Sequence, residues 1–247
     1  KIDLERFSME APLSDNVLDL LKMRAFDTAA CTGSKLQVYV NDTKIPIKNI
    51  REYTESFGGT IVHRDCTTDE STGSFLDVCV SVGSAPQTIG FVNGIRCSLG
   101  THVDLIYRAF SEALSSLVAK KIKRKDVTIK PSLLKDKLTL VLSVLIANPS
   151  FSSQTKEKLE TRCDQFKVSY TCSTSMLRGF EKSGLVETLC DHLRALEDRS
   201  VAKSVKPATS TRLSRNIPKY EPALNINRKQ SDPRFLYITE GDSAKQL

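Results

Sequence analysis

The sequence has no apolar run long enough for a membrane-spanning helix, no Cys-x-x-Cys pair and only three histidines. A transmembrane helix needs about 20 consecutive apolar residues, so we expect no membrane partner. Residues 1–10 lack the order of basic, apolar and small residues that marks a secretory signal. The histidines, His63, His102 and His192, are too widely separated to favour a metal site.

The seven cysteines are scattered at irregular spacing. This pattern indicates reduced thiols in an intracellular compartment rather than a disulfide framework or a zinc site. With 40% hydrophobic and 26% charged residues, the composition is that of an ordinary globular protein, and 247 residues suffice for one large or two modest domains. Both ends read as interruptions of a longer sequence, because there is no initiator Met and residues 244–247 stop inside a motif.

The net charge of +7 is concentrated in two stretches. Residues 119–137 hold eight Lys or Arg against two Asp, and residues 194–234 hold ten against four Asp or Glu. Charge gathered in this way is typical of a surface that faces a polyanion, although a solvated surface gives the same count.

The first part of the chain predicts a small unit that ends at Gly58-Gly59. A helix is expected over residues 14–30, with apolar residues at helical spacing. These are Val17, Leu18, Leu21, Ala25 and Ala29. A hairpin with its turn at Asn41-Asp42 follows over residues 36–47, and then a short helix over residues 49–57.

A second unit begins with three segments that are β-branched or alternate in polarity, which predicts strands. They span residues 60–66, 74–82 and 88–93. The longest predicted helix runs from Thr101 to Lys121, with Thr101 as its cap and one apolar face.

A nearly continuous apolar run over residues 138–146 predicts a strand that is buried on both faces. Two helices are expected over residues 174–182 and 185–198. Residues 200–233 have no apolar period and read as a connector. A new strand is expected over residues 235–238.

The polar segment Gln154-Thr155-Lys156 follows the buried strand after a turn at Asn148-Pro149. Such a loop can reach a terminal phosphate, because Lys supplies a point charge and Gln and Thr supply oriented hydrogen bonds. In the alternative interpretation, the loop caps a following helix through a serine at 152 or 153, and Lys156 is solvated. The tripeptide alone favours this alternative, whereas the preceding strand and turn favour phosphate contact.

A second constellation, Glu240-Gly-Asp-Ser-Ala244, directly follows the strand predicted over residues 235–238. An acidic residue at this end of a strand places a carboxylate at the mouth of an α/β sheet. Mg²⁺ and phosphodiester chemistry are commonly assembled there. The alternative is a turn in which Asp242 or Ser243 caps a helix, and the pentapeptide alone does not decide between the two.

The third constellation is a basic run at the end of the longest predicted helix. It consists of Lys120, Lys121, Lys123, Arg124 and Lys125. Cations are favoured at a helix C-terminus, but five in six residues exceed what a cap requires. If all five bind phosphates, log K should fall against log[salt] with a slope of about −4 to −5. Because no base-reading pattern accompanies the run, the expected DNA contact is insensitive to sequence; the alternative is a solvated helix end.

Together these segments resemble the type IIA DNA topoisomerases, most closely the eukaryotic and viral type of topoisomerase II. The matching stretches occur in the family's order over residues 60–247. They are Phe91-Val-Asn-Gly-Ile95, Gly100-Thr-His-Val-Asp104, the basic run, residues 146–156, Ile217-Pro-Lys219 and residues 238–245. The family often has two glycines before the histidine of the second stretch, whereas Leu99-Gly100-Thr101 precedes His102 here. The alternative to a family role for His102 is a surface position at the helix N-terminus.

The resemblance implies an α+β fold in four parts. Residues 1–57 would be the end of a GHKL-type ATPase domain. Residues 58–199 would be a transducer domain, similar to the second domain of ribosomal protein S5, with a left-handed βαβ crossover. Residues 200–233 would be a linker, and residues 234–247 the start of a toprim domain.

The resemblance also implies roles for the three constellations. Gln154, Thr155 and Lys156 would bind ATP, with Gln154 and Lys156 on its γ-phosphate, and Lys156 would also be a catalytic residue. Glu240 would be a catalytic residue and a ligand of Mg²⁺ at the DNA cleavage site. The basic run would contact double-stranded DNA. The parent enzyme would be a homodimeric isomerase that couples ATP hydrolysis to DNA cleavage and strand passage, and this fragment alone would be inactive.

Two alternatives stay open at this point. A mismatch-repair ATPase shares the pair of ATPase and transducer domains, but does not predict the segment around Glu240. A non-enzymatic S5-like module would bind nucleic acid through the basic run alone. A cellular source would place the enzyme in the nucleus, and a large DNA virus would place it at replication sites in the host cytoplasm.

Overall fold

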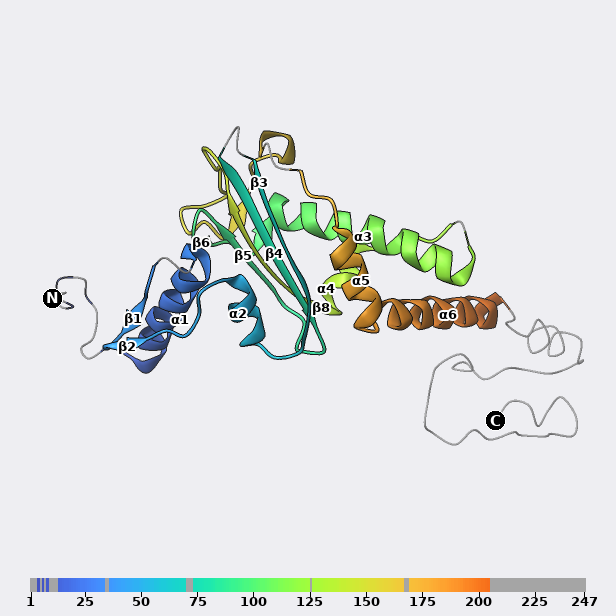
Figure 1. Cartoon of the computed structure of the whole chain (residues 1–247), viewed down its shortest axis with the longest axis horizontal. Coiled ribbons are helices and arrows are strands. Elements are labelled where there is room, and N and C mark those ends of the chain that lie inside the picture. The colour runs from blue at the N-terminus through green and yellow to red at the C-terminus, as the bar shows by residue number, and fades with distance from the viewer. Residues whose placement is uncertain are drawn as a thin grey trace, which may run out of the picture. The chain divides into compact units, whose positions relative to one another are not determined.

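The computed structural model describes residues 13–33, 36–69, 73–124, 126–166 and 169–204, with residues 4, 6 and 8 singly. The chain divides into two units, Lys1–Ala195 and Leu196–Leu247. The first unit contains the sheet and the helices packed on it (Figure 1). Glu240 and the strand predicted before it lie outside the described residues, as does most of the predicted connector.

Five strands form a mixed sheet in the order β3-β4-β8-β5-β6. β3 (Thr60–Asp69), β4 (Ser74–Val82) and β8 (Leu138–Leu145) pair antiparallel, and β5 (Thr88–Val92) runs parallel to β8. β6 (Ile95–Arg96) is antiparallel to β5 at the edge. The strands predicted from β-branched and alternating patterns are confirmed. Because the long helix connects β5 to the adjacent parallel strand β8, the sheet contains a βαβ unit.

Helix α3 (Thr101–Ile122) covers one face of the sheet. Side chains alternate between the two faces along a strand, so Leu140 and Leu142 of β8 pack with Phe110 of α3, while Val141 joins the core on the other face. All four side chains are fully buried, and each contributes about 1.5–3 kcal/mol. The predicted strand buried on both faces is confirmed.

The opposite face of the sheet is covered by α1 (Asp15–Thr32) and α2 (Ile50–Glu55) (Figure 1). Ala29 of α1 and Tyr53 of α2 pack against Phe91 of β5 in this second core. α2 begins where the Asn49 side-chain oxygen accepts hydrogen bonds from two backbone N–H groups of the first turn. Both predicted helices are confirmed.

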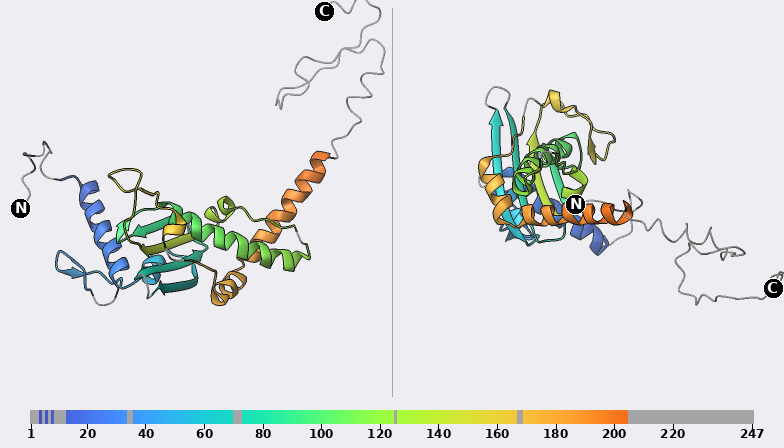
Figure 2. Two further views of the ribbon diagram at one scale, coloured as in Figure 1. Left: turned by 90° about the horizontal axis from the view of Figure 1, so that it is seen from above. Right: turned by 90° about the vertical axis from the view of Figure 1, so that its right-hand side faces the viewer.

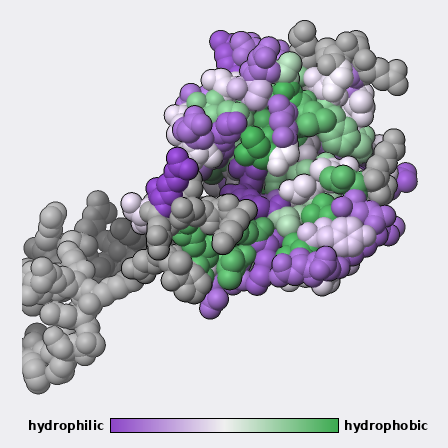
Figure 3. Space-filling model, turned by 90° about the vertical axis from the view of Figure 1, so that its left-hand side faces the viewer, coloured by the Kyte–Doolittle hydropathy of each residue, from purple (hydrophilic) through white to green (hydrophobic). Residues whose placement is uncertain are grey.

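The apolar stripe predicted for α1 is only partly buried. Ala29 is 2% exposed, but Leu18 is 39% and Leu21 is 56% exposed. The face of the molecule turned to the left of Figure 1 accordingly shows apolar groups among hydrophilic ones (Figure 3). The helix predicted from this spacing is confirmed, and the sheet covers only part of its apolar stripe.

The hairpin that follows α1 has very short strands, β1 (Tyr39–Val40) and β2 (Thr43–Lys44). Asn41 and Asp42 have φ of 48° and 63°, as a tight type I′ turn requires. The predicted turn is confirmed.

The remaining elements are α4 (Pro131–Lys135), the 3₁₀ helix η2 (Cys163–Gln165), α5 (Thr174–Lys182) and α6 (Leu185–Ser204). α5 contacts the edge strand β3. The two predicted C-terminal helices are confirmed, but α6 continues to Ser204, so the first five residues of the predicted connector are helical.

Candidate functional site

A short hairpin over residues 151–159, here called the QTK hairpin, carries Gln154-Thr155-Lys156 at its tip. Its arms meet where Phe151 pairs antiparallel with Leu159. The next element is the strand β9 (Lys158–Leu159). The alternative in which this loop caps a following helix is therefore wrong.

The chain that leads from β8 toward the hairpin is held at its start by Asn93, which lies in the turn between β5 and β6. The Asn93 side chain donates to the carbonyl of Ile146 at 3.0 Å and accepts from the N–H of Ile146 at 2.9 Å. One side chain thus satisfies both backbone groups of the residue where β8 ends and the loop toward the QTK hairpin begins.

The second attachment joins the hairpin to the start of α3. β9 runs parallel to β7 (Leu99–Gly100), which leads directly into α3. Gly100 has φ of 118°, and a Cβ atom there would lie 2.2 Å from the carbonyl oxygen of Leu159. Only glycine permits this approach. The left view of Figure 2 shows the hairpin, in yellow, beside the beginning of α3.

Thr101 strengthens the same joint in a way that the sequence did not predict. Its hydroxyl donates to the carbonyl of Thr161 at 2.6 Å, and the N-cap position of α3 belongs to Gly100. The predicted cap role of Thr101 is therefore wrong, because this hydroxyl ties α3 to the segment that follows β9.

The tip of the hairpin exposes Gln154 and Thr155 and leaves Lys156 partly exposed. Lys156 has φ of 57°, and its N–H donates to the carbonyl of Ser153 at 3.1 Å, which closes the turn. The Lys156 ammonium lies 5.6 Å from the centre of the Phe151 ring, within the range of a cation–π contact. No described carboxylate forms an ion pair with Lys156. The tip thus presents a positive charge and polar groups that face solvent.

The basic run lies at the other end of α3. Lys120 and Lys121 occupy the last helical turn, and Lys123 ends the helix in the left-handed conformation with φ of 56°. The ammonium of Lys121 pairs with the carboxylate of Glu187 on α6. Lys125 lies outside the described residues. At least one of the five cations is therefore already engaged within the chain.

Comparison with known proteins decides the family. A family model described as DNA gyrase B matches residues 36–207. DNA topoisomerase 2 of Pisum sativum is 34% identical over 100% of this chain, and that of Acanthamoeba polyphaga mimivirus is 30% identical over 98%. The chain belongs to the type II DNA topoisomerase family. The resemblance seen in the sequence is confirmed, and the mismatch-repair and simple-module alternatives are set aside.

Solved structures narrow the assignment to one region of the type II topoisomerases. The ATPase region of Saccharomyces cerevisiae topoisomerase II superposes with a TM-score of 0.63 and 26% identity, covering 78% of this chain and 49% of that one. The ATPase and transducer domains of Balamuthia mandrillaris topoisomerase II match with a TM-score of 0.63 over 77% of this chain. The chain spans only 17% of the length of the Pisum sativum relative.

The QTK hairpin and the basic run of this topoisomerase chain are not brought together. α3 separates them, and its 22 residues span about 33 Å at 1.5 Å per residue. The two constellations must therefore contact different ligands, or different parts of one large assembly.

His102, in the first turn of α3, is buried and 1% exposed. The alternative of a surface position is therefore wrong. Its Nε2 lies 2.8 Å from the carbonyl of Cys97, and its Nδ1 has no partner among the described residues. Burial lowers the pKa of His102 to about 4, so the ring is neutral near pH 7. A Cβ atom at Gly90 would lie 2.8 Å from Nε2, so the ring fills space that a glycine on β5 leaves open.

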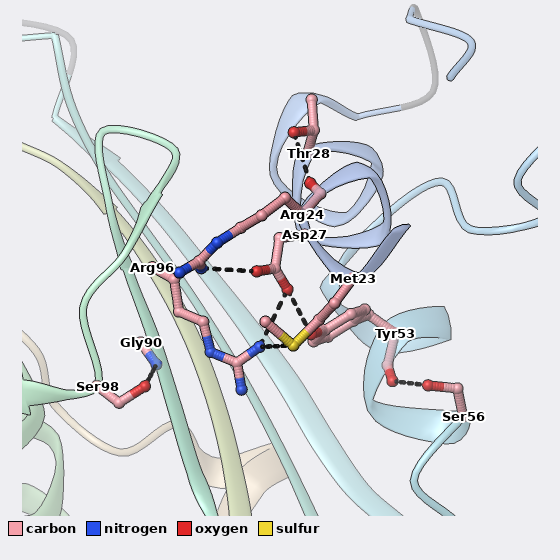
Figure 4. Close-up of polar contacts among 9 residues, drawn as sticks. All are labelled: Met23, Arg24, Asp27, Thr28, Tyr53, Ser56, Gly90, Arg96 and Ser98. Atoms are coloured by element: carbon pink, nitrogen blue, oxygen red, sulfur yellow. Dashed lines mark hydrogen bonds and ion pairs between the residues drawn. The ribbon is translucent and has the colours of Figure 1, made fainter. Parts of the chain in front are cut away.

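A buried carboxylate joins α1 to the edge of the sheet (Figure 4). Asp27 accepts hydrogen bonds from the hydroxyl of Tyr53 at 2.6 Å, from Arg24 at 3.2 Å and from Arg96 at 3.3 Å. Burial and then Asp27 raise the pKa of Tyr53. Sequence reasoning missed this network, because Asp27 and Arg96 are 69 residues apart. The one signal for this network in the sequence was Asp27 itself, which lies on the same helix as the buried Ala29 and Ala30.

Two further expectations concern absences. Within the described ranges, no three His, Cys, Asp or Glu side chains gather in a way that could hold a metal ion. None of the described helices has the length and apolar character needed to cross a bilayer.

Proposed function

We propose that this chain is the part of an ATP-dependent type II DNA topoisomerase that couples ATP binding and hydrolysis to DNA cleavage and strand passage. Residues 58–199 would be the transducer domain, with an S5-like fold and a left-handed crossover. The end of a GHKL ATPase domain would precede it, over residues 1–57. The linker over 200–233 and the toprim start over 234–247 would follow. The observation that carries the proposal is the backbone attachment of the QTK hairpin to β7 and α3.

The tip of the hairpin suits a terminal phosphate. ATP would supply a γ-phosphate that ADP lacks. Lys156 offers an ammonium that no described carboxylate neutralises, and Gln154 and Thr155 offer exposed polar groups beside it. Hydrogen bonds from charged donors to phosphate are about twice as strong as neutral ones. The ring of Phe151, next to the ammonium, restricts the directions in which that charge can point.

A contact made at the tip passes into the body of the domain through the backbone. β9 pairs with β7, and no residue separates β7 from α3. α3 is anchored by Ile106, Phe110 and Leu114, all fully buried. The hairpin therefore cannot move far without α3 and the sheet. A differential contact of about 1–3 kcal/mol shifts a two-state equilibrium by roughly 5- to 150-fold.

The basic run would contact the phosphates of double-stranded DNA. Lys120 and Lys123 are exposed at the end of α3, and Arg124 and Lys125 continue the run. Lys121 contributes only if it leaves Glu187. Each phosphate neutralised changes the slope of log K against log[salt] by about −0.9.

The decisive test replaces Lys156 in the full-length enzyme. Lys156→Ala should lower ATP-dependent relaxation of supercoiled DNA at least tenfold, an effect of about 1.4 kcal/mol. DNA cleavage without ATP should change little, because the cutting centre lies elsewhere. Lys158→Ala is a matched control, since Lys158 is an exposed lysine two residues along the same hairpin. Near-normal relaxation by Lys156→Ala, or an equal loss in Lys158→Ala, would refute the role of the tip.

The wider proposal covers the parent enzyme. Glu240 would bind Mg²⁺ and take part in DNA cleavage, and the enzyme would act as a homodimer whose fragment is inactive alone. Its relatives are eukaryotic and viral, and one from Caenorhabditis elegans is named as mitochondrial. We propose the nucleus for a cellular source and host cytoplasmic replication sites for a viral one.

A further inference from the structure

The edge strand β3 carries a largely buried carboxylate that is held by hydroxyl groups. Asp65, whose side chain is 10% exposed, accepts hydrogen bonds from the hydroxyl of Tyr170 at 2.8 Å and from that of Ser173 at 2.6 Å. The backbone N–H of Ser173 also points to it at 3.4 Å. The only described cationic candidate is His63, at 3.5 Å and 37% exposed. Asp65 thus receives its hydrogen bonds from the segment that precedes α5.

Ser173 connects this carboxylate to the helix itself. It is the N-cap of α5, and its hydroxyl oxygen accepts a hydrogen bond from the N–H of Met176 at 3.0 Å. The same hydroxyl donates to Asp65, and a hydroxyl group can do both at once. Asp65 therefore orients the group that starts α5.

A second contact fixes α5 further along its length. A Cβ atom at Gly179 would lie 2.6 Å from the carbonyl oxygen of Val62 on β3, so the helix backbone lies directly on the strand. Phe180 is fully buried and its ring centre is 5.3 Å from that of Phe110 on α3. α5 is held on β3 at two points and packs on α3 as well.

The two kinds of contact have different consequences. Apolar burial such as that of Phe180 stabilises α5 on the domain without strong directionality. Hydrogen bonds depend steeply on angle, and two hydroxyls converging on one carboxylate fix an orientation. α5 passes through Ser183-Gly184 into α6, so its orientation sets the direction of the helix that leaves the sheet.

We propose that Asp65 is a positioning residue that fixes the direction of α5, and of residues 185–195 of α6 in the same unit, relative to the sheet and so couples ATP-driven movement to strand passage. β3 and β6 are the opposite edges of the sheet. A displacement of the hairpin begins beside β5 and β6. It passes to α5 at β3, through the contact of Asp65. The inference rests on the proposed function, because it assumes that the hairpin receives the ATP signal.

The test measures strand-passage events per ATP hydrolysed by the full-length enzyme. Ser173→Gly removes the hydroxyl while glycine remains an acceptable N-cap, and Asp65→Asn removes the charge. Both should lower the ratio at least fivefold while the rate of ATP hydrolysis stays within twofold. Ser173→Thr keeps the hydroxyl and should restore the ratio. Ser175→Ala, at an exposed position two residues further along the chain, should leave it unchanged.

Tyr170→Phe is a second variant for the case in which Asp65→Asn fails to fold. It removes one hydroxyl and keeps the ring packed on Phe110, and it should lower the ratio in the same direction. An unchanged ratio in Ser173→Gly and Tyr170→Phe would overturn the inference, as would hydrolysis and strand passage falling in proportion. Lys156→Ala, assayed in parallel, tests the role of the hairpin separately. Normal strand passage by Lys156→Ala would refute the proposed function. The ratios of the Asp65 and Ser173 variants would still decide whether Asp65 positions α5.

Discussion

His102 should make the stability of this domain depend on pH. Its folded pKa of about 4 lies below the unfolded value of about 6.5. Between these values the unfolded chain binds a proton that the folded chain does not, so stability falls as the pH falls. From pH 7.5 to pH 5 the loss is about 2 kcal/mol, and it approaches about 3 kcal/mol near pH 4. Above pH 6.5 the histidine adds almost nothing.

Other groups also titrate in this range, so the measurement must be a difference. Denaturant unfolding of the chain and of His102→Gln should be compared at pH 7.5 and pH 5. Glutamine can still donate to the carbonyl of Cys97 but does not titrate. The wild-type chain should lose about 2 kcal/mol more than the variant over this interval. Equal losses would refute the reasoning, because the buried ring would then be protonated as easily as an exposed one.

Three further predictions concern the joints of the domain. Gly100→Ala should destabilise the fold by about 2–4 kcal/mol in denaturant unfolding, because the added Cβ meets the carbonyl of Leu159 at 2.2 Å. An unchanged unfolding midpoint would show that β9 can separate from β7 freely. Asp27→Ala should lower the free energy of unfolding by about 2–4 kcal/mol, since it leaves the partly buried Arg96 and the Tyr53 hydroxyl without their acceptor. A loss below about 0.5 kcal/mol would contradict this prediction. Glu187→Gln should make the slope of log K for duplex DNA more negative by about 0.9, because Lys121 is released from its ion pair; an unchanged slope would mean that Lys121 does not reach DNA.

Local sequence patterns predicted most of the elements. The apolar run of β8 was legible because it is buried on both faces, and the long helix α3 because its apolar residues recur at helical spacing. The polar tip at Gln154-Thr155-Lys156 was found because it follows β8 after a turn at Asn148-Pro149. Each of these signals lies within about 20 neighbouring residues, the range over which periodicity is readable.

The joints between elements were not predictable in the same way. Asp65 and Ser173 are 108 residues apart, and nothing local distinguishes this aspartate from a solvated one. Thr101 was expected to cap α3, but its hydroxyl bonds to Thr161, 60 residues away. His102 was considered for the surface because it begins a helix, whereas it fills the space beside Gly90 on β5. Each error came from a partner that only the folded chain brings near.

The described contacts also indicate where this domain should be stiff and where it should yield. The QTK hairpin, α3 and the sheet share backbone pairing and one apolar core, and interiors packed to this density transmit displacement rather than absorb it. The pair between Lys121 and Glu187, in contrast, is half-exposed on both sides, so solvent screens it and it adds little stability. A phosphate that captures Lys121 therefore removes one exposed contact between α6 and α3 at little cost, while the Asp65 contact keeps α5 on β3. Binding of DNA at the basic run would then compete with one contact of α6, and Glu187→Gln should remove that competition without affecting the hairpin.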